Sequence, residues 1–354
     1  MAGVIDARTR RHLVALAGGA LALGLAGVQP AYSQVSRRPE KPRIQLAVGG
    51  RASLCYLPLL LAEQLGYFRA EGLEVRLADH ASSTLALQAL LAGECDGVAG
   101  AYEHTLLQQA QGRVLQSFVM LGRAPQIALG ISMKTLAHWQ GAADLRGHRV
   151  GVSVPDSSTH MVLRRYLHEH GIPEAAVRVV GVGTSHRAVE ALRAGEIDAV
   201  CNVEPVISLL EARSEVRIVA DTRSLKGTVA LFGGPMPAAC LYADAGFVRT
   251  HPGTCQALAH GSVRALKWLR TAGPSDLMQV VPRGDPLGDA GLFVAAFQKV
   301  SEAFAPDGLM PEGGPATALR AMVELRGDIA PERIDLARSY TDRFALAAKQ
   351  RFKA

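Results

Sequence analysis

The sequence predicts an α/β protein built from two similar, doubly wound lobes that are joined by two crossover segments. Short apolar runs alternate with amphipathic stretches that end at glycine, which is typical of strands alternating with helices. This order occurs twice, and the second copy is displaced by 102 residues. With 354 residues, 49% of them apolar, the chain is long enough for about two domains with buried cores, which excludes a disordered or fibrous protein.

The first copy follows a linker and begins with a short apolar run. Its expected strands cover 44–48, 73–77 and 97–101, and its expected helices run from about 56 to 66 and from 82 to 91. Pro58 lies in the first turn of the first helix, where its missing N–H costs nothing. Hydroxyl side chains at 82–84 are candidate N-caps, and Gly93 ends the second helix. This order implies parallel strands joined by right-handed crossovers.

The second copy repeats that order. Its expected strands cover 149–153, 177–180 and 198–202, and its expected helices cover 157–169 and 186–193. The segment ALLAGECD at 89–96 corresponds to ALRAGEID at 191–198. Chance agreement of small and apolar residues is the alternative. The AGExD element recurs at matching helix-to-strand turns, however, so two related lobes are the simpler explanation.

The segments between the two copies predict how the lobes are connected. Residues 126–133 are expected to be extended and to lead out of the first lobe, and 228–232 with 238–242 to lead back. Helices are expected over 255–269 and 289–304. The first lobe is therefore predicted as 43–130 with 235–354, and the second lobe as 131–234. Parallel sheets bind ligands at the carboxyl ends of their strands, so one cleft between the lobes is expected.

The N-terminus resembles an export signal. Three arginines at 8–11 precede an apolar, glycine-containing stretch over 13–28, and a small-residue triplet follows at 31–33. The stretch of 16 residues is shorter than the ~20 that span a bilayer. A signal peptide over 1–33 and a linker over 34–42 are therefore predicted, and the mature protein is expected in the periplasm.

The route of export stays open. Residues 9–14 resemble a twin-arginine signal, although the Phe and Lys that this signal favours are missing, so Sec export is the alternative. No cysteine lies within or just after the apolar stretch, so a lipid anchor is not expected.

Charge and cysteine content narrow the function further. Lys and Arg number 38 against 32 Asp and Glu, and no run of five like charges occurs, which argues against a nucleic-acid-binding surface. We expect a monomer. The five cysteines are predicted to be small buried apolar residues, with a disulfide as the open alternative; they are Cys55, Cys95, Cys201, Cys240 and Cys255.

One segment carries a family resemblance. Residues 56–75, YLPLLLAEQLGYFRAEGLEV, resemble the P-x-x-x-A-x-x-x-G-Y-F-x-x-E-G-L-x-V signature of periplasmic solute-binding proteins of ABC importers for nitrate, sulfonates, taurine and thiamine precursors. LRG-x-x-VGV and S-S-x-H elements within 145–160, and Glu204-Pro205, extend the resemblance over about 43–270. Val203 stands where the family usually has an aromatic residue. The resemblance implies a type II periplasmic-binding-protein fold, a small-molecule ligand, and a membrane permease with its ATPase as partners.

Loops that follow the predicted strands supply candidate ligand contacts. Their glycines, hydroxyls and helix-start amides suit a carboxylate, sulfonate or nitrate. In the first copy these residues are Gly50, Arg51, Ser53, Ser82, Ser83 and Thr84; in the second they are Ser157, Ser158, Thr159, His160, Thr184 and Ser185. The alternative for each hydroxyl is a role as an N-cap alone.

A second group of candidates points to a different ligand. Tyr102, Glu103 and His104 follow the third strand, and Asn202 and Glu204 follow its counterpart. Carboxylates beside the cleft favour an amine, an amidine-like ring or a hydroxylated heterocycle, whereas the arginine in the first loop favours an anion. A solvated charge at a helix start is the alternative for the second carboxylate.

Enzyme signatures are incomplete. GVSVP at 151–155 lacks the second glycine of a nucleophile elbow, and Gly181-Val182-Gly183 lacks the third glycine of a dinucleotide fingerprint. His168 and His170 are two residues apart and do not share a helical face, which argues against zinc. A pyrimidine synthase of thiamine assembly is similar in its early signature, but its CCCFC motif is absent here. We therefore expect no catalytic residue, metal or cofactor, and a solute receptor; an exported enzyme or a sensor module is the alternative.

Overall fold

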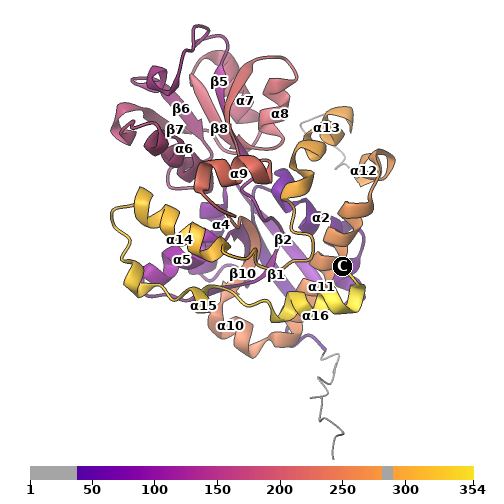
Figure 1. Cartoon of the computed structure of the whole chain (residues 1–354). Coiled ribbons are helices and arrows are strands. Elements are labelled where there is room, and N and C mark those ends of the chain that lie inside the picture. Colours follow the sequence, from indigo (N-terminus) through magenta and orange to yellow (C-terminus); the bar gives the residue numbers. More distant parts are fainter. Residues whose placement is uncertain (1–37, 281–289) are drawn as a thin grey trace, which may run out of the picture. The chain divides into compact units, whose positions relative to one another are not determined.

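A computed structural model describes residues 38–280 and 290–354. The predicted signal peptide and the first part of the linker lie outside the described residues. Two five-stranded sheets form the centre of the fold (Figure 1). None of the helices within the described ranges is long and apolar enough to cross a membrane.

The first sheet contains most of the first sequence copy. Its strand order is β2-β1-β3-β10-β4, with β1 at Arg43–Gly49, β2 at Glu74–His80, β3 at Gly97–Ala101, β4 at Leu115–Met120 and β10 at Ala239–Asp244. β1 pairs parallel with β2 and β3, whereas β10 runs antiparallel between β3 and β4. The central strand β3 is buried along its whole length, as expected for a sheet covered on both faces.

The second sheet has the same arrangement. Its strand order is β7-β6-β8-β5-β9, with β5 at Ile127–Ser132, β6 at Arg149–Val152, β7 at Arg178–Gly181, β8 at Ala199–Val203 and β9 at Val216–Asp221. β6 pairs parallel with β7 and β8, and β5 runs antiparallel between β8 and β9. The predicted pair of doubly wound α/β lobes is confirmed, and each sheet contains one strand of opposite direction next to its edge.

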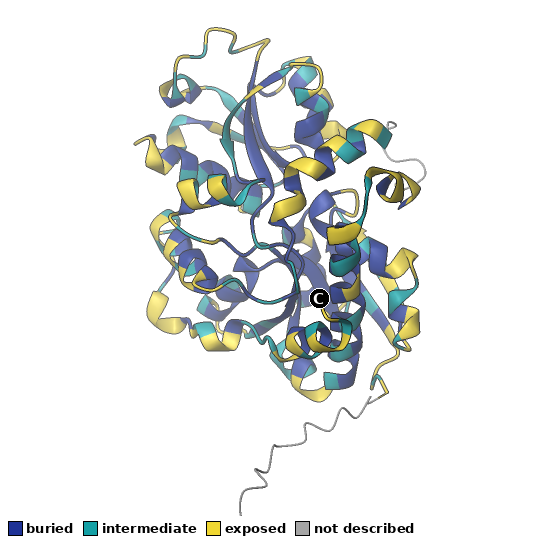
Figure 2. Cartoon of the chain, turned by 45° about the vertical axis from the view of Figure 1, so that its right-hand side comes forward, coloured by how far each residue is buried: buried dark blue, intermediate teal, exposed yellow. Residues whose placement is uncertain are grey.

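Helices cover both sheets. Those packed around the first sheet are η1 (Leu54–Tyr56), α2 (Leu57–Gln64), α3 (Tyr67–Ala70), α4 (Ser83–Leu91), α5 (Glu103–Ala110), α10 (Ala245–Thr250), α11 (Pro252–Thr271) and α16 (Arg343–Phe352). Those in the chain segment of the second sheet are η2 (Ala142–Leu145), α6 (Ser158–Glu169), η3 (Glu174–Ala176), α7 (His186–Ala194), α8 (Val206–Glu211) and α9 (Leu225–Phe232). In Figure 2 the central strands of both sheets are buried, whereas the edge strands β2, β7 and β9 and the outer faces of the helices are partly exposed.

The remaining helices are α12 (Pro274–Val280), α13 (Ala290–Val300), η4 (Ser301–Ala303), α14 (Gly314–Leu325), η5 (Pro331–Arg333) and α15 (Leu336–Ser339). Two of them contact helices of the second sheet: α13 packs on α8, and α14 packs on both α5 and α6. Lys299 Nζ lies 2.7 Å from Glu211 Oε2, and Arg165 NH1 lies 2.5 Å from Glu324 Oε2. The C-terminal region is thus in contact with elements of both sheets.

The repeated AGExD turn has the same geometry in both copies. Gly93 and Gly195 end their helices with φ of +77° and +74°, which glycine adopts without strain. Asp96 Oδ2 accepts a hydrogen bond from the backbone N–H of Gln45 at 2.9 Å, and Asp198 Oδ2 accepts one from Arg149 at 3.0 Å. The aspartate of each turn therefore anchors the start of the neighbouring parallel strand.

One local prediction is wrong. Residues 228–232, predicted to be extended, form the second half of α9. Ser224 caps this helix by accepting from the N–H of Gly227, and Gly233 ends it at a φ of +71°. The other return segment, 238–242, does pair as strand β10. The apolar β-branched composition of the helix resembles that of a strand, and its N-cap decides the outcome.

The cysteines are unpaired. All five are free thiols, four of them buried and Cys95 half-buried. The prediction of small buried residues therefore holds for four, and the open alternative of a disulfide is not realised.

Candidate functional site

A cavity lies where the loops that follow the strands of both sheets meet. Its lining residues are Gly49, Ser53, Cys55, Tyr56, Ser83, Ala101, Glu103, Pro125, Ile127, Ser153, Ser158, Thr159, Met161, Thr184, Val203, Met236, Pro237, Ala238 and Ala239. About 50 Å³ of this cavity is open to the centre of a water molecule. The structure thus contains a partly open space suited to a small molecule.

Six predicted site residues line this cavity. They are Ser53, Ser83 and Glu103 from the first copy, and Ser158, Thr159 and Thr184 from the second. Gly50 lies next to them: a Cβ atom at this position would be 2.6 Å from Thr184 Oγ1 and 2.9 Å from Ser53 Oγ. Its φ of +98° also requires glycine. The loop after the first strand of the first copy therefore meets the loop after the second strand of the second copy.

Among the described residues that line the cavity, Glu103 is the one with an ionisable acidic or basic side chain of the Asp, Glu, Lys, Arg or His type. It is the first residue of α5 and is buried, and its Oε1 accepts a 2.5 Å hydrogen bond from Ser158 Oγ on α6. Burial raises the pKa of the Glu103 carboxyl, against the opposing effects of the Ser158 hydroxyl and its own backbone N–H. Within the described ranges no Lys, Arg or His pairs with it. The carboxyl is therefore held by a neutral donor from the opposite side of the cavity.

Ser53 contributes an unsatisfied hydroxyl. Its side chain is buried, and Oγ has no hydrogen-bond partner in the part of the chain that the structure describes. The backbone N–H of Ser53 donates to Gly50 O at 2.9 Å, which folds the loop and places the hydroxyl beside the cavity. Buried polar groups normally have a partner, so this hydroxyl is available to a bound molecule.

Some predicted hydroxyls act as N-caps. Ser82 Oγ accepts from the N–H of Leu85 at 3.2 Å at the start of α4, and Ser157 caps α6. Ser157 Oγ donates to Val154 O at 2.6 Å and lies 2.9 Å from Thr159 Oγ1. Ser82 and Ser157 lie outside the cavity lining and shape the loops that carry the lining residues.

Two other predicted hydroxyls are also outside the lining. Ser185 occupies the N-cap position of α7 without a side-chain cap bond and is exposed. Thr84 Oγ1 is buried without a partner among the described residues.

Tyr102 and His104 lie behind the cavity in the core. Tyr102 OH is 2.6 Å from Ser339 Oγ, and His104 Nδ1 is 2.9 Å from Tyr242 OH. Burial lowers the pKa of His104 to about 4, so the ring is neutral at pH 7. Neither residue lines the cavity.

His160 and Asn202 support second-copy loops. His160 Nδ1 accepts from the N–H of Asp156 at 2.9 Å, and burial lowers the pKa of its ring. Asn202 Nδ2 donates to Gly183 O at 2.9 Å and thereby holds the loop that carries Thr184. Both side chains position loops and lie outside the lining.

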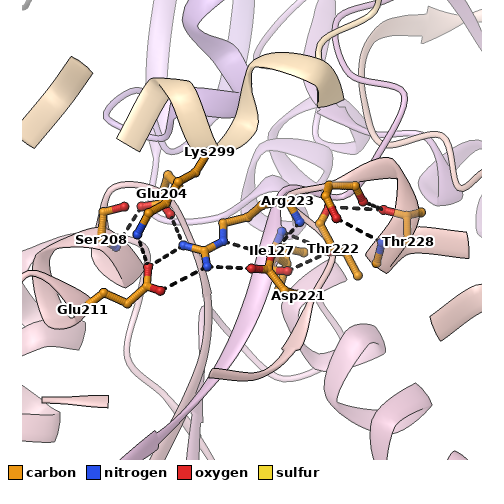
Figure 3. A network of polar contacts seen from close by, with 11 residues as sticks. Ile127, Glu204, Ser208, Glu211, Asp221, Thr222, Arg223, Thr228 and Lys299 are labelled. Carbon is orange, nitrogen blue, oxygen red and sulfur yellow. Dashed lines mark hydrogen bonds and ion pairs between the residues drawn. The ribbon is translucent and has the colours of Figure 1, made fainter. Parts of the chain in front are cut away.

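Glu204 belongs to a buried ion-pair network (Figure 3). Its Oε1 accepts from Arg223 NH1 at 2.7 Å and its Oε2 from the N–H of Ser208 at 2.9 Å. The same guanidinium pairs with Glu211 and Asp221, each at 2.6 Å. The backbone carbonyl of Glu204 accepts from the N–H of Leu54 at 3.0 Å, which connects the second sheet to the loop after β1. The charge of the Glu204 carboxylate is therefore neutralised by Arg223 within the protein.

Arg51 is turned away from the cavity. Its side chain is exposed, and its NH2 atom lies 3.7 Å from Glu63 Oε2. The backbone N–H of Arg51 donates to Asp79 Oδ1 at 2.6 Å. Sequence reasoning therefore located the correct loop for this residue, while the arginine itself points elsewhere.

Several lining residues were not predicted. Tyr56 begins the family signature, Cys55 directly precedes it, and Ser153 ends a predicted strand, so position alone could have suggested them. Met161, Met236 and Pro125 carry no polar signal and are brought to the cavity by the packing of distant segments. No group of three or more His, Cys, Asp or Glu side chains is gathered for a metal ion in the ranges 38–280 and 290–354.

Comparison with known proteins identifies the family of this chain. The sequence model of the NMT1-like family matches residues 38–280. The chain belongs to this family. The NMT1-like protein is 44% identical to a protein of known structure from Bordetella bronchiseptica RB50, with a TM-score of 0.87, over 90% of this chain and 100% of that one. No curated protein matches it in sequence.

More distant structures share the fold of this NMT1-like protein. The periplasmic nitrate-binding protein NrtA from Synechocystis PCC 6803 has a TM-score of 0.72 at 14% identity, over 90% of both chains. The alkanesulfonate-binding protein SsuA from Xanthomonas axonopodis pv. citri, bound to MOPS, has a TM-score of 0.63 at 19% identity, over 85% of this chain and 98% of that one. The predicted periplasmic-binding-protein fold is thus confirmed.

Proposed function

We propose that this protein is the periplasmic substrate-binding component of an ABC transporter, which captures a small solute between its two lobes and delivers it to the permease. The cavity at the meeting point of both sets of loops is the observation that carries this proposal. Membership of the NMT1-like family and the fold shared with nitrate- and alkanesulfonate-binding proteins support it.

Contacts across the cavity supply a route from binding to closure. Ser158 reaches Glu103, Thr184 lies against Gly50, and the Leu54 N–H donates to the Glu204 carbonyl. A solute that touches both sides favours the closed arrangement by its differential affinity for that arrangement. The permease and its ATPase would then recognise the closed form.

Two solute classes remain candidates. An organic anion such as a sulfonate or taurine, or nitrate, is favoured by the N-termini of α4 and α6, whose first residues Ser83 and Ser158 line the cavity. A pyrimidine or similar heterocycle is favoured by the carboxyl of Glu103 in the same lining.

Binding without turnover is the mode of action we propose. Cys55 is the one thiol in the described lining, and burial raises its pKa to about 12, so it is protonated and a poor nucleophile at pH 7. An exported enzyme or a sensor module on the same scaffold is the alternative.

A thermal-shift screen tests the function. The purified protein is heated with taurine, alkanesulfonates, nitrate, bicarbonate, aromatic carboxylates and thiamine precursors. A binder raises the melting temperature in proportion to RT ln(1 + [L]/Kd) and is recovered unchanged. Small-angle scattering then checks that the same compound makes the protein more compact. Formation of a product from any bound compound would reject the transport role.

A further inference from the structure

The described cavity lining contains an acidic side chain and no basic side chain. Glu103 is the one ionisable carboxylate there, and among the described lining residues no Lys, Arg or His faces it. The other polar groups are neutral hydroxyls, of Ser53, Ser83, Ser158 and Thr184 among others. An anion placed in this space would lie next to a carboxyl group without a basic side chain to bind it.

The nearby arginines are already paired. Arg51 is exposed beside Glu63, and Arg223 is shared by Glu204, Glu211 and Asp221. Arg164 lines a small neighbouring cavity with Glu103, but its guanidinium is 2.6 Å from Glu174 Oε2 and 2.8 Å from Asp156 Oδ1. Recruiting any of them to an anionic solute would break existing ion pairs.

The carboxyl of Glu103 has an open position. Oε1 accepts from Ser158, whereas Oε2 has no side-chain hydrogen-bond partner in the part of the chain that the structure describes. A carboxylate offers about four acceptor positions, so the solute can supply the missing donors. The orphaned Ser53 hydroxyl in the same lining is a second, independent group without a partner.

We infer that the solute carries a nitrogen group, such as a protonated amine, an amidine or an amino-substituted heterocycle, that donates hydrogen bonds to Glu103. The inference rests on the proposed function and names the solute class for the same cavity. Such a group replaces the lost hydration of the buried carboxylate, whereas a purely anionic solute adds repulsion to the cost of desolvation.

Matched pairs of compounds test the inference. Each pair differs mainly in one nitrogen group: taurine and ethanesulfonate, 4-aminobutyrate and butyrate, 4-aminopyrimidine and pyrimidine, with nitrate as a simple anion. Titration calorimetry and thermal shift are measured at millimolar concentration on wild type, E103Q and E71Q. Glu103→Gln removes the charge and keeps an oxygen for Ser158. Glu71→Gln is the control, because Glu71 is largely buried, pairs with His260 and Arg351, and lies outside the lining.

The expected result is selective binding of a nitrogen-bearing compound. Wild type and E71Q should bind it, E103Q should bind it roughly 30-fold more weakly, and its partner without nitrogen should bind more weakly still or not at all. Equal binding of both members of a pair, undiminished binding by E103Q, or binding of no nitrogen-bearing member would overturn the inference.

A second measurement on wild type keeps the test independent of the variants. Affinity for an amine that stays protonated should rise as Glu103 ionises with increasing pH, whereas affinity for an anion should fall. A compound that shows the Glu103 preference and is also converted to a product would reject the transport role and leave the solute class standing. Tight binding of nitrate or ethanesulfonate without turnover would reject the nitrogen-bearing solute class and leave the transport role standing.

Discussion

Ser158, the first residue of α6, donates a 2.5 Å hydrogen bond to the carboxyl of Glu103, the first residue of α5. The two helices belong to different copies of the repeated α/β unit. Both residues also line the same cavity. This one bond therefore couples the position of the two copies to the chemistry of the cavity.

Ser158→Ala should weaken closure. The substitution leaves the buried Glu103 carboxyl without its donor, at a cost of about 1 to 3 kcal/mol in the closed form. We expect a larger radius of gyration by small-angle scattering and weaker binding of any solute found. Ser185→Ala is the matched control, because Ser185 is exposed and its side chain makes no cap bond. Equal behaviour of both variants would contradict the coupling.

Glu103 should give the protein a pH-dependent stability. Burial raises the pKa of this carboxyl above the ordinary value of 4.5, so the folded chain holds the proton more tightly than the unfolded chain. Its contribution is complete below pH 4.5 and is lost as the pH rises through the raised pKa. Urea unfolding of wild type and E103Q across this range should show wild type losing stability relative to E103Q. A difference that does not change with pH would refute this assignment.

Gly50→Ala should impair both folding and closure. The φ of +98° strains any L-residue, and the added Cβ would meet Thr184 Oγ1 at 2.6 Å. Gly93→Ala is a matched control, because its φ is +77° and a Cβ there would meet nothing within 4 Å. Each should cost about 1 kcal/mol of stability from strain. Calorimetry with a bound solute should show lost affinity in G50A alone; the same loss in G93A would mean that strain, and not the contact, is responsible.

Arg223→Met should destabilise the chain strongly. It leaves Glu204, which is buried, without a positive partner, and burial already raises the pKa of that carboxyl. We expect a loss of about 3 kcal/mol in urea unfolding at pH 7. Arg217→Met, on the strand β9 that precedes Arg223, removes an exposed guanidinium that among the described residues donates to the Trp139 carbonyl, and should change stability by about 0.5 kcal/mol or less. Similar losses would argue against the network.

Asp198→Asn should expose the role of the repeated turn. Hydrogen bonds from Arg149 outweigh the effect of burial and lower the pKa of this carboxyl below 3.8. Its contribution is complete above pH 3.8 and is lost as the pH falls through the lowered pKa. D198N should lose about 1 to 2 kcal/mol at pH 7, with little difference from wild type in strong acid. Glu196→Gln, an exposed neighbour paired with Arg187, is the control; a loss that persists in strong acid would contradict the ionic mechanism.

The order of strands and helices in the two copies could be predicted from the sequence because the local patterns in these segments are strong. The strand at 97–101 and the helix over 186–193 were predicted to within a residue, since apolar runs and glycine stops are local signals. Strands β4 and β9, and helices α5 and α8, were not predicted. The short apolar runs of β4, β9 and α8 fit either a strand or a helix, and pairing with the distant strands β10 and β5 decides β4 and β9.

The loops that form the candidate site could also be predicted from the sequence, but the direction in which each side chain points could not. Parallel strands put their following loops at one edge, so Ser53, Glu103 and Thr184 could be assigned to a common region from sequence. Arg51 and Glu204 were equally good candidates by that rule. The first turns outward to Glu63, and the second is paired with Arg223, which lies just after β9.

The sequence by itself therefore determined the repeated α/β units, their family and the set of loops that meet. Only the tertiary structure decided which charge faces the cavity. Periodicity and capping act over a few residues, whereas the burial of Glu103, its bond to Ser158 and the pairing of the arginines depend on groups brought together from distant parts of the chain. The ionic character of the cavity is a product of that long-range packing.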